Sequence, residues 1–463
     1  MSTDTYRHER LLAALRAEYE ARFPASKGAH ARATTVLIDG GSHGARAFEP
    51  YPFYVREAEG AYITTLEGHR LVDFWQGHYA NILGHNPGLI RDALVDSLQH
   101  GAGLQTGMFE ERETEFARLL AETTGAERVR LTTAGTLATM YAIMLARGYT
   151  GRRLVVKITG GWHGANPMAL KGVDRGASGF DAVDSAGVPE ATADEIVVTP
   201  FNDVDTLHKI FRSLGDRIAC LIFEPCLGGA GFIAASRLFM DAARQLTTQY
   251  GALLILDEVI TGFRFCAGGV QRLYGVQPDL STFGKIVGGG MPLAAVAGRA
   301  EVMAVAGKGA KNRVWFNGGT YSAHPLTLVA GQAMIAYLRD HEDTLYPALA
   351  ARGAALRQGI EKVFADRGVL ARCTGHPNDA IGGGSLAAIY FPRRDDMHPQ
   401  SAEDMTDPRL SDVRLREEGL KLGLLLHGIN VVHGLGALST AHTDADLARV
   451  FEACDAFAKR LTA

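Results

Sequence analysis

LLILDEVITGFRF, residues 253–265, and PDLSTFGKIVGGGMPLAAVAG, residues 278–298, are the two stretches that decide the fold of this chain. The first opens with an apolar run rich in Leu and Ile, which is typical of a buried strand. Asp257 is the first charged residue at the C-terminal end of that run. Because ligands of open α/β sheets bind at this edge of the strands, Asp257 is a candidate functional residue.

Lys285 lies in the second stretch, in a Gly-rich and otherwise apolar segment. Desolvation lowers the pKa of an amine and makes it a better nucleophile. A lysine and a carboxylate are what pyridoxal phosphate chemistry requires, since the lysine forms a Schiff base and the carboxylate keeps the pyridine nitrogen protonated. A phosphate-binding loop is the alternative, but Ile286 follows Lys285 where that loop has Ser or Thr. We therefore expect Lys285 and Asp257 to be catalytic.

Composition is that of an ordinary globular protein. The chain has 463 residues, 47% of them apolar and 21% charged, and a net charge of −4 without any basic run. We therefore expect no nucleic-acid or membrane partner. The N-terminal residues are polar, and no stretch is long enough to span a membrane. Five scattered cysteines without metal-ligand spacing predict free thiols, no metal site and a cytoplasmic location: Cys220, Cys226, Cys266, Cys373 and Cys454.

Strands and helices alternate in the middle of the chain. We expect strands at 129–133, 154–158, 218–223, 253–257 and 293–297, and helices at 136–147 and 236–250. This alternation predicts an α/β fold with a central, mostly parallel sheet and helices on both faces.

The flanking regions are more mixed. An amphipathic helix is expected at 5–23, short strands within 51–73, helices at 87–99 and 111–123, a strand near 386–391, a polar surface loop at 392–410 and a last helix at 444–461. The predicted division is an N-terminal segment with part of a small α+β domain (1–75), a large cofactor-binding domain (76–331) and a C-terminal small domain (332–463).

Three motifs resemble those of a known family. DEVITGFR (257–264), FGKIVGGGMP (283–292) and GTYSAHP (319–325), in this order and spacing, are similar to motifs of the class III pyridoxal-phosphate-dependent aminotransferases. The likeness runs from about residue 46 to about residue 443, and is nearest to glutamate-1-semialdehyde 2,1-aminomutases and β-amino-acid aminotransferases. It implies fold type I, pyridoxal phosphate as cofactor, and a homodimer with shared active sites.

Residues around the cofactor follow from the pattern and the resemblance together. Val259 lies two residues after Asp257 and so on the same face, where it can pack against the pyridine ring. The resemblance puts Trp162 at the position of an aromatic residue, more often Tyr, that stacks on the other ring face. The alternative for Trp162 is a buried core residue. For the neighbouring His163, a hydrogen-bonded structural role and a catalytic role both remain open.

A turn between a predicted strand and helix is the expected phosphate site. Ala134, Gly135 and Thr136 can offer backbone N–H groups at the helix N-terminus. The family usually reads Asn-Ser-Gly-Thr-Glu here, so the serine hydroxyl is absent from this chain. The resemblance also implies that Thr320 completes the phosphate site of the partner subunit. The alternative for Thr320 is a turn residue next to glycines.

On the substrate side the chain departs from the aminomutases. Arg46 matches the position of a carboxylate-binding arginine in the resembling families, and its planar fork suits that task. Where aminomutases have Gly-Ser-Trp-Gly, this chain has Gln-Gly-His-Tyr, so His78 and Tyr79 are candidate substrate contacts. Gly434 stands where aminomutases carry a glutamate.

These features favour an aminotransferase that acts on an amino acid and a keto acid, both bearing a carboxylate, by ping-pong chemistry. Intramolecular amine transfer, as in glutamate-1-semialdehyde 2,1-aminomutase, is the main alternative. Decarboxylation or racemisation on the same fold is a further one. The presence of Lys285, Asp257 and Trp162 argues against a binding protein without activity.

Overall fold

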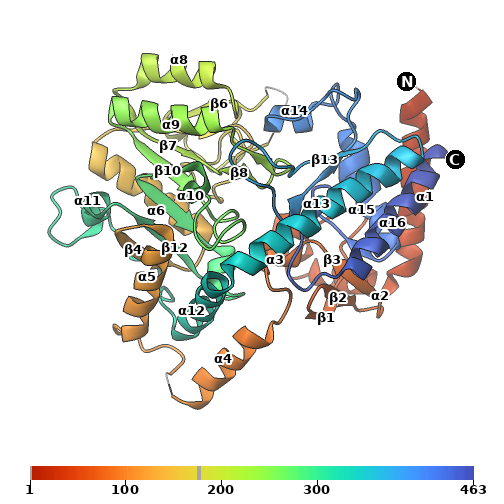
Figure 1. The fold of residues 1–463 in the computed structure, drawn as a ribbon, viewed down its shortest axis with the longest axis horizontal. Coiled ribbons are helices and arrows are strands. Elements are labelled where there is room, and N and C mark those ends of the chain that lie inside the picture. The colour runs from red at the N-terminus through yellow and green to blue at the C-terminus, as the bar shows by residue number, and fades with distance from the viewer. Residues whose placement is uncertain (1–2, 102, 175–178) are drawn as a thin grey trace.

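A sheet of seven strands forms the centre of the computed structural model, which describes residues 3–101, 103–174 and 179–463 (Figure 1). Its strand order is β4-β12-β11-β10-β7-β5-β6. Strand β12 is antiparallel to both of its neighbours, and the other pairs are parallel. The strands are β4 (Arg128–Thr132), β5 (Leu154–Ile158), β6 (Ile196–Thr199), β7 (Ile218–Phe223), β10 (Leu253–Asp257), β11 (Leu280–Phe283) and β12 (Ala294–Gly298). The predicted mostly parallel sheet is confirmed.

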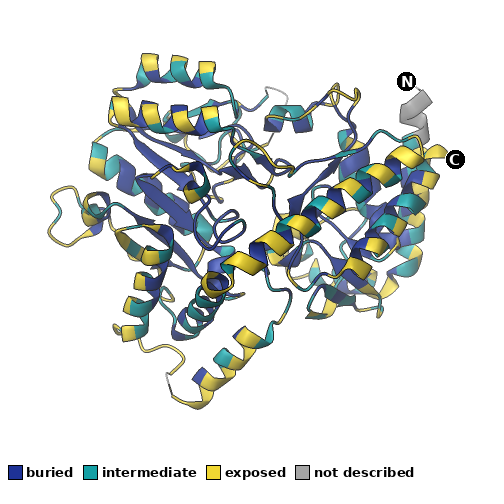
Figure 2. Cartoon of the chain, viewed as in Figure 1, coloured by how far each residue is buried: buried dark blue, intermediate teal, exposed yellow. Residues whose placement is uncertain are grey.

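Helices cover both faces of this sheet because successive strand residues point to opposite sides. Leu253 and Ile255 pack with α6 (Gly135–Thr150) on one face. Leu254 and Leu256 pack with α8 (Val204–Leu214) and α9 (Arg237–Tyr250) on the other. Figure 2 shows the strands buried between these helices. Asp257 is an even number of residues from Leu253 and Ile255 along the same strand, so its side chain points to the same face as theirs, the α6 face.

The predicted strands β5, β7 and β10 have the expected bounds, and β4 and β12 are shifted by one residue. Strands β6 and β11 were not expected. Strand β6 has only four residues, and β11 contains Ser281 and Thr282, which are buried although the sequence there is not a continuous apolar run.

The two ends of the chain meet in a second sheet. It consists of β1 (Val55–Glu59), β2 (Tyr62–Thr65), β3 (Arg70–Asp73) and β16 (Ile429–Asn430), with β16 parallel to β3. The first helix, α1 (Thr3–Arg22), lies beside α16 (Asp444–Thr462), and Arg460 donates a hydrogen bond of 2.8 Å to Glu18 (Figure 1). Leu15 and Tyr19 of α1 are fully buried, as its apolar stripe predicted. The domain limits at residues 75 and 331 stay predictions.

The remaining long helices are α4 (Gly88–Gln99), α5 (Glu111–Thr124), α12 (Pro325–Asp340) and α13 (Glu342–Asp366), with α2 (Pro24–Ala33) following α1. The predicted strand at 386–391 is divided into β14 (Leu386–Ala387), which pairs with β17 (Gly436–Ala437), and β15 (Ile389–Tyr390), which pairs with β13 (Arg372–Cys373). The predicted loop at 392–410 contains the short helix α14 (Ala402–Thr406).

The shorter elements are α7 (Glu190–Ala193), β8 (Cys226–Leu227), β9 (Ile233–Ala234), α10 (Gln271–Tyr274) and α11 (Ala300–Met303). In the part of the chain that is described, no helix is both long enough and apolar enough to cross a bilayer. All five cysteines are free and buried.

Candidate active site

A cavity of about 230 Å³ opens at the C-terminal edge of the large sheet. It is lined by strand ends and by the N-terminus of α6, which the strand order brings together. Most of the cofactor residues expected from the sequence lie in its wall: Ala134, Gly135, Thr136, Trp162, Asp257, Val259 and Lys285.

Asp257 is held in one orientation at the end of β10. Its side chain is nearly inaccessible, with the residue 3% exposed. One carboxylate oxygen accepts a hydrogen bond from Nδ1 of His163 at 2.7 Å, and the other accepts from the Thr282 hydroxyl at 3.0 Å and from the backbone N–H of Val259 at 3.1 Å. The Nε2 atom of His163 is buried without a partner among the described residues. His163 thus orients Asp257, which fits the hydrogen-bonded role.

Lys285 follows β11 directly and begins a short 3-10 turn (Lys285–Gly288). Its φ of +52° lies in the left-handed region, which is unfavourable for a residue with a side chain. Such strain occurs where the surrounding structure fixes a functional residue. Burial lowers the pKa of the Lys285 amine, while the carboxylates of Asp257 and Glu224 oppose this shift. The amine is therefore closer to the neutral, nucleophilic form than a lysine in water.

The phosphate end of the cavity is the N-terminus of α6. Ala134 is the extended N-cap residue, and no described side chain caps the helix there. The first N–H groups of α6 are thus available to an anion. Gly135 is packed tightly against Val259, because a Cβ atom on this glycine would lie 3.1 Å from the Val259 Cγ1 atom.

Trp162 is fixed by a residue that the sequence analysis missed. Its ring is 43% exposed at the cavity, and its backbone N–H donates to the Glu224 carboxylate at 2.9 Å. Glu224 is buried at the end of β7, and it also accepts from the N–H of Gly228 at 3.0 Å. Burial and the nearby Asp257 raise the pKa of Glu224. Glu224 stands at the end of an apolar run, as Asp257 does. This sequence pattern could have identified it.

These residues fit pyridoxal phosphate. A buried carboxylate at one end of the cavity, an uncapped helix N-terminus at the other, and a nucleophilic amine between apolar walls match the pyridine nitrogen, the phosphate and the aldehyde carbon of that cofactor. Val259 and Trp162 are available for the two faces of the ring.

A second cavity, of about 320 Å³, contains the predicted substrate residues Arg46 and His78. The Arg46 Nε–H group donates to Nε2 of His78 at 3.4 Å. Burial lowers the pKa of His78 to about 3, with His43, Arg46 and Lys285 adding to the shift. His78 is therefore neutral, and the influence of Lys285 indicates that this cavity adjoins the cofactor site.

His78 belongs to a left-handed turn labelled α3 (Gln76–Tyr79), in which every residue has a positive φ. The carboxylate of Asp73 stabilises this turn by accepting from the N–H groups of Trp75 at 3.0 Å and Gln76 at 2.9 Å. Successive left-handed residues cost roughly 1–2 kcal/mol each. Strain of this kind marks the segment as a functional one.

Two predicted residues lie apart from these cavities. Tyr79 is buried in an apolar cluster with Cys226 and Phe232, and its hydroxyl has no partner among the described residues. Thr320 is exposed, and its carbonyl accepts from Nε2 of Gln105 at 2.7 Å. Their roles toward substrate and toward a partner's phosphate stay predictions.

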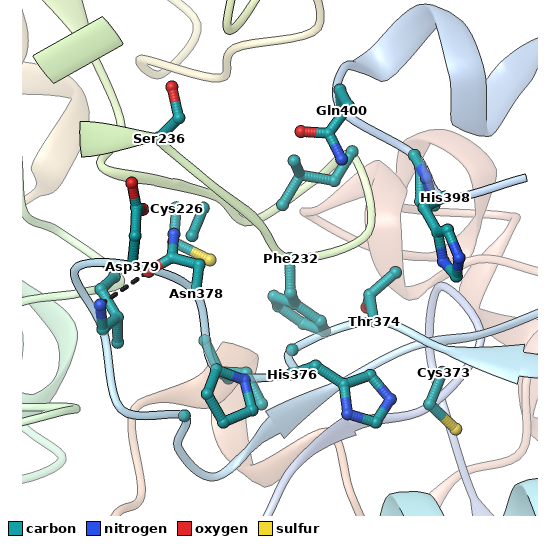
Figure 3. Close-up of a pocket in the computed structure, with 18 of the residues that line it drawn as sticks. Cys226, Phe232, Ser236, Cys373, Thr374, His376, Asn378, Asp379, His398 and Gln400 are labelled. Carbon is teal, nitrogen blue, oxygen red and sulfur yellow. Dashed lines mark hydrogen bonds between the residues drawn. The ribbon is translucent and has the colours of Figure 1, made fainter. Parts of the chain in front are cut away.

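A third cavity, of about 380 Å³, is lined in part by Cys226 and Phe232, which belong to the apolar cluster that holds Tyr79 (Figure 3). Phe232 lines it and also contacts Tyr79, with ring centroids 5.1 Å apart. Its polar residues, such as His376, Asn378 and His398, come from the C-terminal part of the chain. No residue predicted for the active site is among the described residues that line it.

Comparison with known proteins agrees with this geometry. The family model described as aminotransferase class-III matches residues 43–451. A glutamate-1-semialdehyde 2,1-aminomutase of Hyperthermus butylicus is 36% identical over 402 residues, covering 87% of this chain and 91% of the relative.

Two solved structures resemble the whole fold. An omega-transaminase from Sphaerobacter thermophilus is 33% identical with a TM-score of 0.85, covering 95% of this chain and 98% of that one. A β-phenylalanine aminotransferase from Variovorax paradoxus is 30% identical with a TM-score of 0.82, covering 97% of each chain. The chain therefore belongs to the class III aminotransferases, with fold type I and pyridoxal phosphate as its cofactor.

Proposed function

We propose that this enzyme is a transaminase that moves an amino group from a carboxylate-bearing amino acid to a keto acid. The observation that carries this proposal over an aminomutase is the backbone at Gly434. Its φ is +98°, and a Cβ atom there would lie 2.7 Å from the carbonyl oxygen of Ile389. The position that corresponds to the aminomutase glutamate therefore has no room for any side chain.

In this proposal each residue of the cofactor cavity has a separate task. Bound pyridoxal phosphate supplies a protonated ring that takes up electrons when a C–H bond beside the nitrogen breaks. Asp257 keeps the proton on the ring nitrogen, and His163 and Thr282 keep Asp257 in position. Val259 and Trp162 hold the ring plane.

Lys285 has two tasks. With pyridoxal phosphate bound, the Lys285 amine would hold the cofactor covalently, and as a free amine it would accept a proton from the substrate carbon and donate it again. Lowering of its pKa by burial favours the base form. Arg46 binds the substrate carboxylate, and the neutral His78 accepts from Arg46 and so limits its orientation.

The second candidate is intramolecular amine transfer. The aminomutase of Hyperthermus butylicus, at 36% identity, favours it. The Omega-transaminase and the β-phenylalanine aminotransferase are slightly less identical but cover more of the chain. Since identity alone does not separate two reactions on one fold, the lack of space for a side chain at Gly434 is the stronger argument.

A nitrogen label separates the two candidates. The holoenzyme is given ¹⁵N-labelled amino acids from an α-, β- and ω-series, each with unlabelled 2-oxoglutarate, and the products are identified by mass spectrometry. We expect the label in newly formed glutamate and none in an isomer of the donor. The proposal fails if one amino acid is converted repeatedly to its isomer, with the label retained, when no keto acid is present.

We further propose that the active unit is a cytoplasmic homodimer in which Thr320 of each subunit contributes to the other subunit's phosphate site. Exposed apolar residues near Thr320 support the dimer. Five free cysteines support a reducing compartment.

A further inference from the structure

Lys421 is a cation of the substrate cavity that no sequence pattern indicated. It is the first residue of α15 (Lys421–Leu426), and its side chain lines the same cavity as Arg46 and His78. Its ammonium lies over the ring of Phe48, 4.2 Å from the centroid, and Phe48 lines the cavity too. Lys421 and Arg46 thus bring two positive charges to one cavity.

The Lys421 ammonium has no ion-pair partner within 4.0 Å in the part of the chain that the structure describes. The nearby carboxylate of Glu417 is engaged elsewhere, since it accepts from Arg416 Nε at 2.7 Å and lies 3.6 Å from Nδ1 of His433. Burial lowers the pKa of Lys421 to about 8, and Glu417 opposes the shift. The amine is therefore largely protonated at pH 7 although it is partly removed from water.

Asp73, the one carboxylate among the described residues that line this cavity, is not available to Lys421. Its oxygens accept from the N–H groups of Trp75 and Gln76, from Nε2 of His85 at 2.7 Å and from Nδ2 of Asn430 at 2.6 Å. These four donors saturate the carboxylate. A cation in such a wall gains most from an anion that arrives with the ligand.

The backbone before Lys421 supports a functional position. Residues Leu415–Leu420 form a π-helical turn that leads directly into α15. Turns of this type are rare and frequently occur at functional sites, because the extra residue changes the direction in which the following side chains point. Much of the wall of this cavity is apolar, with Phe53, Ile63 and Val432 among its residues.

We propose that Lys421 binds a second carboxylate of the substrate, so that the cavity takes amino acids and keto acids with carboxylates at both ends of a short hydrocarbon chain. The inference rests on the proposed function, because Arg46 binds the first carboxylate there. Methylene groups between the two acids contact the apolar wall. Monocarboxylic substrates of the same length leave Lys421 without a partner.

The test measures binding without turnover. Glutarate and valerate have the same chain length, and neither has an amine or a carbonyl that could react, so calorimetry on the holoenzyme gives both dissociation constants at one ionic strength. We expect the dissociation constant of glutarate to be lower than that of valerate by about ten-fold or more, because glutarate makes one additional charged contact. Lys421→Met should lower the affinity for glutarate to that for valerate. Lys421→Arg should keep part of the preference for glutarate.

Two variants serve as controls. Lys362→Met makes the same chemical change at an exposed residue paired with Asp366 on α13, and should leave both affinities unchanged. Arg46→Ala should lower the affinity for both ligands, because each has the carboxylate that Arg46 binds. In kinetics, Lys421→Met should raise the KM for 2-oxoglutarate about ten-fold with little change in kcat, and should leave the KM for 2-oxopentanoate within about two-fold of its wild-type value.

A glutarate preference that survives in Lys421→Met, or a wild-type enzyme that binds both acids equally, would overturn the assignment. Failure of the proposed transamination gives a different result. If the label is retained in an isomer that forms without a keto acid, the proposed transamination is wrong. The two dissociation constants would still report whether Lys421 recognises a second carboxylate.

Discussion

Asp257 and Glu224 are carboxylates at the ends of the neighbouring strands β10 and β7, and their donors suit them to different work. Asp257 accepts hydrogen bonds from an imidazole, a hydroxyl and one backbone N–H group, and it lines the cofactor cavity. Glu224 accepts from two backbone N–H groups and so fixes the chain at Trp162 and Gly228.

Asp257→Asn tests the electronic role directly. The amide oxygen can still accept hydrogen bonds, so we expect the fold and covalent attachment at Lys285 to persist. The ring nitrogen loses its anionic partner, and kcat/KM should fall by roughly 100-fold or more. Steady-state kinetics and a melting curve of the same preparation measure both effects. Activity within a few-fold of wild type would show that Asp257 only organises the strand end.

Residues at strand ends were predictable from the sequence, whereas residues brought in from distant helices were not. Asp257 ends an apolar run, and such runs form buried strands whatever the rest of the chain does, whereas Lys285 was noticed from its Gly-rich apolar segment although the strand before it was not expected. Lys421 reaches the substrate cavity only because β16 pairs with β3, a contact between residues more than 350 positions apart. No local pattern encodes that pairing, so composition and spacing could not reveal Lys421.

At the level of elements, two turns with left-handed backbone shape the substrate cavity and its surroundings. One is the Gln76–Tyr79 turn, and the other contains His433 and Gly434, between β16 and β17. The comparison with the aminomutase motif predicted His78 as a substrate contact, but no sequence pattern indicated that four consecutive residues there have a positive φ. Hydrogen bonds from Trp75 and Gln76 to Asp73 impose that geometry, and they form only once β3 is in place.

Gly434→Ala tests whether the second turn excludes side chains. The new Cβ would meet the carbonyl oxygen of Ile389 at 2.7 Å in a left-handed conformation, so we expect a loss of about 3 kcal/mol. The matched control is Gly382→Ala, where a Cβ would have nothing within 4 Å. Thermal unfolding should show a Tm lower by several degrees for Gly434→Ala alone. Equal Tm values for the two variants would mean that the turn can accept the aminomutase-type glutamate.

At the level of the whole molecule, the site needs the two chain ends and the central sheet at once. The fully buried Arg264 illustrates this, because its guanidinium donates to the carbonyl oxygens of Tyr79 and Leu438 and to the Ser385 hydroxyl. Burial lowers the pKa of Arg264 to about 10. One side chain of the motif found in the sequence thus joins the N-terminal substrate turn to the C-terminal strands.

Large apolar side chains are exposed on the part of the chain around Thr320, where the proposed partner subunit would cover them. Phe109 is 97% exposed, Met108 78% and Trp315 65%. Met108 and Phe109 line a cavity of about 320 Å³ together with Thr320 and Arg130. A monomer rarely leaves such a group of large apolar side chains in water.

Subunit mixing tests both the dimer and the sharing of sites. Lys285→Ala and Thr320→Glu should each be inactive as homodimers, the second because a carboxylate would repel the phosphate. In a hybrid dimer the subunit with the glutamate keeps its own Lys285 and receives Thr320 from its partner, so one site of two is intact. Random exchange should restore about a quarter of wild-type activity.

Lys285→Ala mixed with Asp257→Asn is the matched control and should restore none, because both changes act within one subunit's own site. A fully active monomer in sedimentation at assay concentration, or equal activity in the two mixtures, would contradict shared sites.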